Sequence, residues 1–198
     1  MKICNFGNLS SIFLAAGVMA TPVHAENIDE LFANLKQFVA QEQYPNALEE
    51  LQWMRRELDK LHIEKINSYF PDNLAGLQGN EPKSQSVLGF TNMSRSYSGD
   101  GKNVNVALTG GASAAGGLAA LAQMASLLGT QQDAETYRLA GRTATLVIDP
   151  DGKTSISVSL KSGSLLSFES NDLSEVGKLK EIAREFPVAG LDNYLAGH

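Results

Sequence analysis

Cysteine and histidine are nearly absent from this chain of 198 residues. Cys4 is its only cysteine, and its three histidines stand at isolated positions. A disulfide needs two cysteines, and zinc sites are built mainly from cysteine and histidine ligands. The sequence therefore excludes an internal disulfide and predicts no zinc site.

The chain also has fewer basic than acidic residues. The chain has 16 lysines and arginines against 22 acidic residues, a formal net charge of −6. Proteins that bind nucleic acid or anionic membranes usually carry basic patches, so we expect neither partner here. Hydrophobic residues make up 43% of the chain, which is enough for a folded core. The length suits one ordinary domain with a small helical appendage.

Residues 1–25 have the pattern of a secretory signal peptide. Lys2 gives a basic start, residues 12–20 form a short apolar run, and Val23 and Ala25 make a small-x-small cleavage site. The alternative is a membrane anchor, but so short a run spans a bilayer poorly. Cys4 precedes the apolar run, where a lipoprotein acylation site would not be. We therefore expect a periplasmic or secreted protein, whose mature chain lacks cysteine and has no stable membrane span.

Residues 26–69 are predicted to form a helical hairpin. Apolar residues recur at helical spacing in two segments, which read Ile28, Leu31, Phe32, Leu35, Phe38 and Val39, then Leu48, Leu51, Met54, Leu58 and Leu61. Gln43 and Tyr44 interrupt the pattern, and Pro45 suits the first turn of a second helix. The hairpin resembles one tetratricopeptide-type unit. Because a single unit cannot form a solenoid, it should pack against something else.

Residues 70–198 are predicted to form an α+β domain. Alternating apolar residues between Arg142 and Ser170 indicate a three-stranded antiparallel meander, with turns at residues 149–152 and 161–164. The meander's inward face should hold Ala144, Leu146, Ile148, Ile156, Val158, Leu160, Leu166 and Phe168. A strand hairpin around residues 98–101 precedes it, and a helix after Asn171 follows it. The predicted fold class is a mainly antiparallel sheet covered by helices, preceded by the helical hairpin.

The run from Asn103 to Gln132 carries no charged residue. Its second part is rich in glycine and alanine, and Ala112, Gly116 and Ala120 follow a small-xxx-small spacing. A membrane-inserting helix is one interpretation. A buried helix lying on the sheet is the better one, because its hydrophobicity is modest and its first part is an Asn-rich strand.

Several segments resemble a group of uncharacterised exported bacterial proteins with a sandwich similar to the Mog1/PsbP/DcrB-like fold. The resemblance covers roughly residues 70–195 and lies in residues 69–76, the hairpin of residues 94–109, residues 141–144 and the final strand–helix pair. The resemblance implies an α/β sandwich in an exported protein. Its motifs are structural, and it supplies no catalytic residues.

Three segments have some features of a functional site, but each lacks residues that the site would need. Gly111 and Gly116 have the spacing of a phosphate loop, but the following lysine is missing. Ser113 resembles the serine of a nucleophile elbow, which needs a histidine base. His62 is expected on a helix surface outside the sandwich and His198 at a frayed end, so neither is well placed. Asp149–Gly152 hints at a calcium loop, but a hairpin turn is favoured. We predict no catalytic, cofactor-binding or metal-binding residues, and no cofactor.

Two functional hypotheses follow. The favoured one is an exported, non-enzymatic binding or protein-interaction module whose partner is a protein or small ligand of the cell envelope. The alternative is an unrecognised hydrolase that uses Ser113 or a carboxylate pair. An enzyme would need polar groups converging near Ser113, with a base within hydrogen-bonding distance.

The first prediction concerns export. Cleavage after Ala25 is expected, because a small-x-small site directly follows the apolar run. N-terminal sequencing of the exported protein should begin at Glu26. A protein recovered only with Met1 at its start would contradict the expected localisation.

Overall fold

The computed structural model describes residues 23–87, 90–111, 134–171 and 176–197 of the chain. The chain divides into two compact units, Met1–Asp59 and Lys60–His198, and the division falls within the second helix. We call them the hairpin unit and the sheet unit and describe each by itself.

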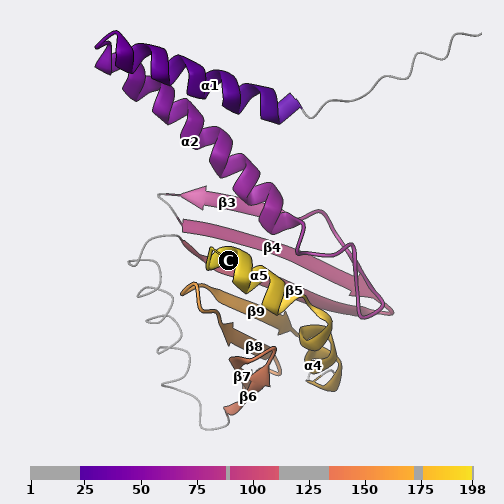
Figure 1. Cartoon of the computed structure of the whole chain (residues 1–198). Helices are drawn as coiled ribbons and strands as arrows, with labels where there is room; N and C mark the ends of the chain where they lie inside the picture. The colour runs from indigo at the N-terminus through magenta and orange to yellow at the C-terminus, as the bar shows by residue number, and fades with distance from the viewer. Residues whose placement is uncertain (1–22, 88–89, 112–133, 172–175, 198) are drawn as a thin grey trace, which may run out of the picture. The chain divides into compact units, whose positions relative to one another are not determined.

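The hairpin unit is formed by two consecutive helices. Helix α1 spans Val23–Ala40, and α2 spans Tyr44–Asn67, with its last residues in the sheet unit (Figure 1). Residues 41–43 form the turn, in which Glu42 has a positive φ of 58° and the Gln43 amide donates to the Phe38 carbonyl at 2.9 Å. Pro45 is the second residue of α2, so the break and the proline occur where the sequence predicts them.

The sheet unit is built on one antiparallel sheet. Its strands are β1 (Asn73–Leu74), β2 (Leu77–Gly79), β3 (Lys83–Val87), β4 (Phe90–Gly99), β5 (Lys102–Gly111), β6 (Glu135–Leu139), β7 (Arg142–Ile148), β8 (Thr154–Ser159) and β9 (Leu165–Ser170). The spatial order is β1-β2-β4-β5-β9-β8-β7-β6, and β3 pairs with β4 beside this path. All described pairings are antiparallel. The structure confirms the predicted α+β fold class.

The strand registers place the apolar residues in rows across one face. Leu146 lies opposite Ile156, which lies opposite Phe168, and Phe168 in turn lies opposite Val106. All four side chains are buried. Period-two alternation turns every second residue of each strand to the same side, so the meander and the β4–β5 hairpin share one core face.

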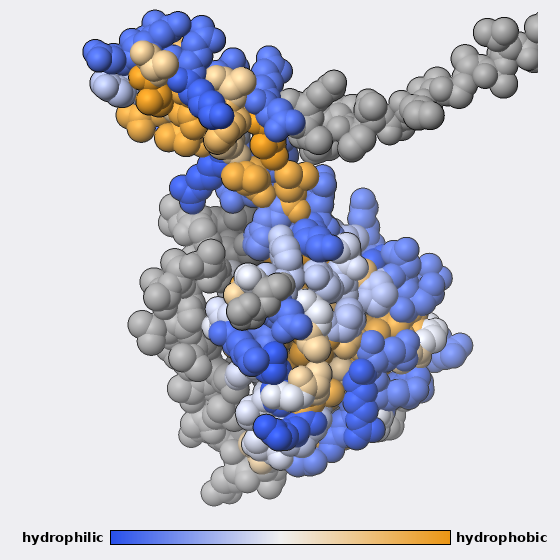
Figure 2. Space-filling view, in the orientation of Figure 1, coloured by the Kyte–Doolittle hydropathy of each residue, from blue (hydrophilic) through white to orange (hydrophobic). Residues whose placement is uncertain are grey.

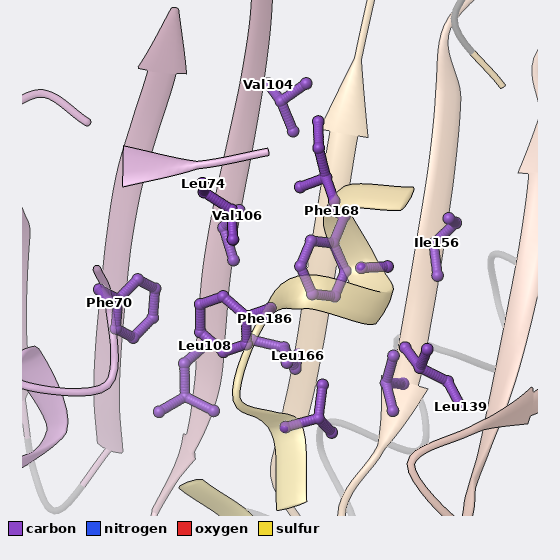
Figure 3. Packing of buried hydrophobic residues seen from close by; sticks show 14 of the residues in the cluster. Phe70, Leu74, Val104, Val106, Leu108, Leu139, Ile156, Leu166, Phe168 and Phe186 are labelled. Carbon is purple, nitrogen blue, oxygen red and sulfur yellow. The ribbon is translucent and has the colours of Figure 1, made fainter. Parts of the chain in front are cut away.

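Two C-terminal helices lie on this face (Figure 1). They are α4 (Val176–Glu185), which packs on β8 and β9, and α5 (Val188–Leu195). Between them, the Phe186 ring makes edge-to-face contacts with Phe70 and Phe168, at centroid distances of 5.2 and 5.5 Å (Figure 3). Ile66, near the end of α2, belongs to the same buried cluster.

The structure corrects details of the sequence interpretation. The sequence pattern of residues 76–82 predicts an irregular connector, but this segment includes β2, which pairs with β1 and β4. Ile148 was expected on the core face, yet its side chain is 39% exposed because it ends β7 beside the turn. Thr145 and Val147 alternate with the core residues of β7 and are nevertheless buried, so β7 is covered on both faces. The predicted third helix lies within residues 112–133, outside the described residues.

The second prediction tests the register of the meander. Val158→Asp places a carboxylate at a fully buried position, which should lower the unfolding free energy by about 4 kcal/mol or more, or abolish soluble expression. Ser157→Asp, whose side chain points to the other face and is partly exposed, should cost about 1 kcal/mol or less. Urea unfolding followed by circular dichroism measures both. Equal damage from the two variants would contradict the one-sided burial of β8.

Candidate functional site

The hairpin unit exposes more than half of its large apolar side chains. Eight large hydrophobic residues are exposed in the described part of the chain, and seven of them lie in this unit, namely Phe32, Val39, Tyr44, Leu48, Leu51, Trp53 and Leu58. Figure 2 shows these helices carrying a concentration of hydrophobic surface. Scattered exposed leucines need no explanation, but such a concentration is typical of an interaction surface.

The side of each helix that faces the other is marked by a hydrogen bond. Asn34 Nδ2 of α1 donates to Glu50 Oε1 of α2 at 3.1 Å. Leu31 and Phe38 lie about one turn before and after Asn34, so they share its side of α1. Ala47 and Glu57 share the side of Glu50 on α2 by the same spacing.

Exposed residues directly follow these facing residues in the sequence. On α1, Phe32 and Val39 come directly after Leu31 and Phe38. On α2, Leu48, Leu51 and Leu58 come directly after the facing residues Ala47, Glu50 and Glu57. One residue step rotates about 100° around a helix axis, always in the same sense. Because the helices of a hairpin are antiparallel, both rotations lead to the same side of the hairpin. We call this surface, Phe32, Val39, Tyr44, Leu48, Leu51 and Leu58, the apolar flank.

Few residues are buried between the two helices of the hairpin unit. Among its described residues, only Ala47 and Glu57 are buried, while the side chains of the apolar flank are 45–62% exposed. An isolated pair of helices gains little stability from propensity alone, and most helical stability in proteins comes from packing an apolar face. The flank is therefore the face on which this unit can gain most by burial.

Charges of both signs border the apolar flank. Lys36 Nζ lies 4.6 Å from the centre of the Phe32 ring, and Arg55 Nε lies 3.9 Å from Asp59 Oδ2 one turn further along α2. The Arg55–Asp59 pair is exposed and contributes little to stability. Trp53 is also exposed, but it lies on another side of α2, where the Arg56 guanidinium stacks 4.6 Å from its ring.

Arg95 is the buried cation of the sheet unit. Its guanidinium donates to the carbonyl oxygens of Asn80 and Phe70 at 2.7 and 2.6 Å and to Asp72 Oδ1 at 2.7 Å. A Cβ at Gly79 would lie 2.5 Å from Arg95 Nε, which explains the glycine there. These bonds hold the segment between α2 and β3 against β4, so the role of Arg95 is structural.

Asp192 of α5 is the buried anion of this unit. Its Oδ1 accepts from the Lys161 and Ser162 amides at 2.8 and 3.3 Å, and its Oδ2 accepts from Arg142 Nε. Both carboxylate oxygens are thus engaged, and the side chain is fully buried. The carboxylate ties α5 to the β8–β9 turn and to the start of β7.

Burial also governs the tyrosines of the sheet unit. Desolvation raises the pKa of Tyr97 to about 12, against a smaller lowering by Arg95, and Asp72 raises it slightly further. Burial likewise raises the pKa values of Tyr137 and Tyr194. These phenols are neutral at physiological pH and cannot act as bases there.

The structure corrects the expected surroundings of His62. It was placed on a helix surface outside the sandwich, but it belongs to the sheet unit and is only partly exposed. Its Nδ1 lies 2.9 Å from the Tyr194 hydroxyl of α5. A histidine near the end of α2 could reach α5 only through the tertiary fold, which helical spacing does not reveal.

Most of the other residues that the sequence suggested for a site lie outside the described part of the chain. Ser113, Gly116 and His198 lie outside the described residues, so the hydrolase and phosphate-loop interpretations are untested. Gly110, just before that segment, is buried, and a Cβ there would lie 2.2 Å from Ser164 Oγ. Close packing therefore requires the glycine.

The Asp149–Gly152 segment is a turn, as predicted. The Gly152 amide donates to the Asp149 carbonyl at 2.9 Å, and Gly152 has a φ of 90°. Within the described ranges, no group of three or more histidine, cysteine, aspartate or glutamate side chains is arranged to hold a metal ion. None of the described helices is long and apolar enough to cross a membrane.

Comparison with protein-family models, with curated proteins and with solved structures finds no significant match for this chain. The resemblance to exported proteins of the Mog1/PsbP/DcrB-like fold stays a prediction. The apolar flank is therefore the candidate site on the strength of its exposure and geometry alone.

The third prediction uses the Tyr97 hydroxyl, which is buried without a hydrogen-bond partner among the described residues. Its raised pKa means that folded Tyr97 keeps its proton while an unfolded tyrosine loses it near pH 10. This contribution to stability is fully present below about pH 10 and is lost as the pH rises toward 12.

Urea unfolding between pH 7 and pH 11.5 checks this expectation. Tyr97→Phe should change the unfolding free energy at pH 7 by about 1 kcal/mol or less, and should flatten its decline at high pH. Tyr69→Phe, which alters a partly exposed tyrosine of the same unit, is the control and should leave the decline largely unchanged. A decline that is the same in Tyr97→Phe as in the wild type would contradict the burial of this phenol.

Proposed function

We propose that this protein is an exported, non-enzymatic protein-interaction module that binds through the apolar flank of its helical hairpin. The observation that carries the proposal is the contrast within the hairpin unit. Six large apolar residues, each about half exposed, share one side of the hairpin. Among the unit's described residues, only an alanine and a glutamate are buried. A surface of this kind is stabilised when another polypeptide covers it.

A helical partner segment fits this surface best. On α2 the flank is a ridge of Tyr44, Leu48, Leu51 and Leu58 at spacings of three, four and seven residues, and on α1 it is Phe32 and Val39, two turns apart. Ridges of that kind accept the apolar face of another helix between them. Tyr44 and Phe32 would supply the large rigid contact area that dominates binding energy at protein interfaces.

The buried charged residues of the sheet unit have structural roles, so no catalytic role is needed to explain them. Two charged groups buried among its described residues, Arg95 and Asp192, bind backbone groups that hold the fold together. His62, which the sequence does not favour as a base, lies with its Nδ1 2.9 Å from the Tyr194 hydroxyl. These engagements support a binding role over the hydrolase alternative.

The fourth prediction tests the interaction surface in cells that express the protein. A photoreactive phenylalanine analogue replaces Leu48 or Leu51 in the flank, or Trp53 as the control, whose exposure of 48% is close to the 45% of Leu51. Irradiation should produce adducts above the monomer mass from the two flank positions and far less from position 53. No adducts from the flank, or equal adducts from all three positions, would contradict the proposed function.

A further inference from the structure

The apolar flank can be covered by a segment of the same chain, by a different protein or by a second copy of the same surface. We propose that its occupant is the same flank of a second copy of this chain, so that two hairpins form a four-helix interface. This proposal rests on the proposed function, since it names the partner of the same surface.

The shape of the flank suits self-association. A two-fold axis brings the same patch of both copies together, so the patch must be able to match itself. The flank has one stripe from each of two antiparallel helices. Face-to-face contact therefore gives four helices around a shared apolar centre, as in a four-helix bundle. The α2 stripe from Tyr44 to Leu58 extends over about 21 Å, which is about four helical turns.

The charges at the border of the flank permit this pairing. The whole chain has a net charge of −6, and a border of one sign would repel its own copy. The border instead combines Lys36 with Asp59, and Asp29 lies two turns before Lys36 on α1, while Arg55, within the α2 stripe, is paired with Asp59. A border with both signs can meet its symmetry mate with opposite charges facing, because each copy supplies both partners.

The apolar content of the flank points the same way. Apart from Arg55, the side chains along the α2 stripe are leucines and a tyrosine, and those along the α1 stripe are a phenylalanine and a valine. Permanent homodimer interfaces are more apolar than transient ones and resemble a domain core divided between two chains. The hairpin unit lacks such a core in its described residues, and the second copy supplies it.

The experiment uses the full exported chain with Cys4→Ser, in case residues 1–25 are retained, so that any added cysteine is the only one. Sedimentation equilibrium should show a dimer for this parent protein. Leu51→Glu combined with Leu58→Glu should raise the dimer dissociation constant about 100-fold or more, because charges replace the centre of the interface. Trp53→Glu, a matched exposed position on another side of α2, should change it less than about threefold.

Single-cysteine variants give a second readout that survives if the glutamate variant fails to fold. Leu48→Cys and Leu51→Cys should form intermolecular disulfides under mild oxidation much faster than Trp53→Cys. A monomeric parent at about 100 μM would overturn the proposal, since permanent dimers dissociate well below this concentration. A dimer weakened equally by the flank and Trp53 changes, or disulfides formed equally at all three positions, would also overturn it.

The two levels of the proposal fail separately. Flank photo-adducts with a different protein, from a chain that is monomeric in solution, would overturn the second copy and leave the interaction module standing. Absence of flank adducts together with a monomeric chain would overturn both. Adducts between two differently tagged copies, together with flank-specific disulfides, would support both.

Discussion

One-sided packing of the antiparallel sheet against α4 and α5 is the contact on which the sheet unit depends. The row Leu146, Ile156, Phe168 and Val106 runs across four strands, and the Phe186 ring meets Phe168 from the helical layer. Each fully buried side chain of this size contributes about 1.5–3 kcal/mol relative to exposure. The strand register, the turns and the polar ties all serve to keep these residues on one face.

The two buried ions hold opposite borders of that layer. Arg95 binds carbonyl oxygens of the segment before β3, and Asp192 binds amides of the β8–β9 turn. Each buried ion is itself satisfied by these backbone groups, and a buried charge without such partners would be costly. Arg95 and Asp192 are therefore used in folding, and this directs attention to the hairpin for function.

Much of the sheet could be predicted because its signals are local. Alternation between Arg142 and Ser170 and the glycine-containing turns specify strands and their inward faces without reference to the rest of the chain. The short strands β1 and β2 could not be predicted, since they are ordered by pairing with β4 and by Arg95. The burial of Thr145 on the second face of β7 and the contact of His62 with Tyr194 also depend on distant partners.

The candidate surface could be predicted only in part. Helical spacing identified the apolar stripes, but it does not divide residues that face the other helix from residues beside them. The Asn34–Glu50 hydrogen bond makes that division, and it places Leu48, Leu51 and Leu58 beside the facing side of α2, in the exposed flank. Because each helix is rotated so that its largest apolar residues lie beside the helix contact, the flank is exposed and few side chains are fully buried between the helices.

Hydrogen exchange at several protein concentrations tests the central claim most directly. If a second copy supplies the missing core, amide protection in α1 and the first half of α2 should fall as the protein is diluted through the dimer dissociation range. Protection in β5, β8 and β9 should stay constant over that range, since the sheet unit has its own core. Hairpin protection that is strong and independent of concentration would contradict the account, because it would mean that the flank is already covered within a single chain.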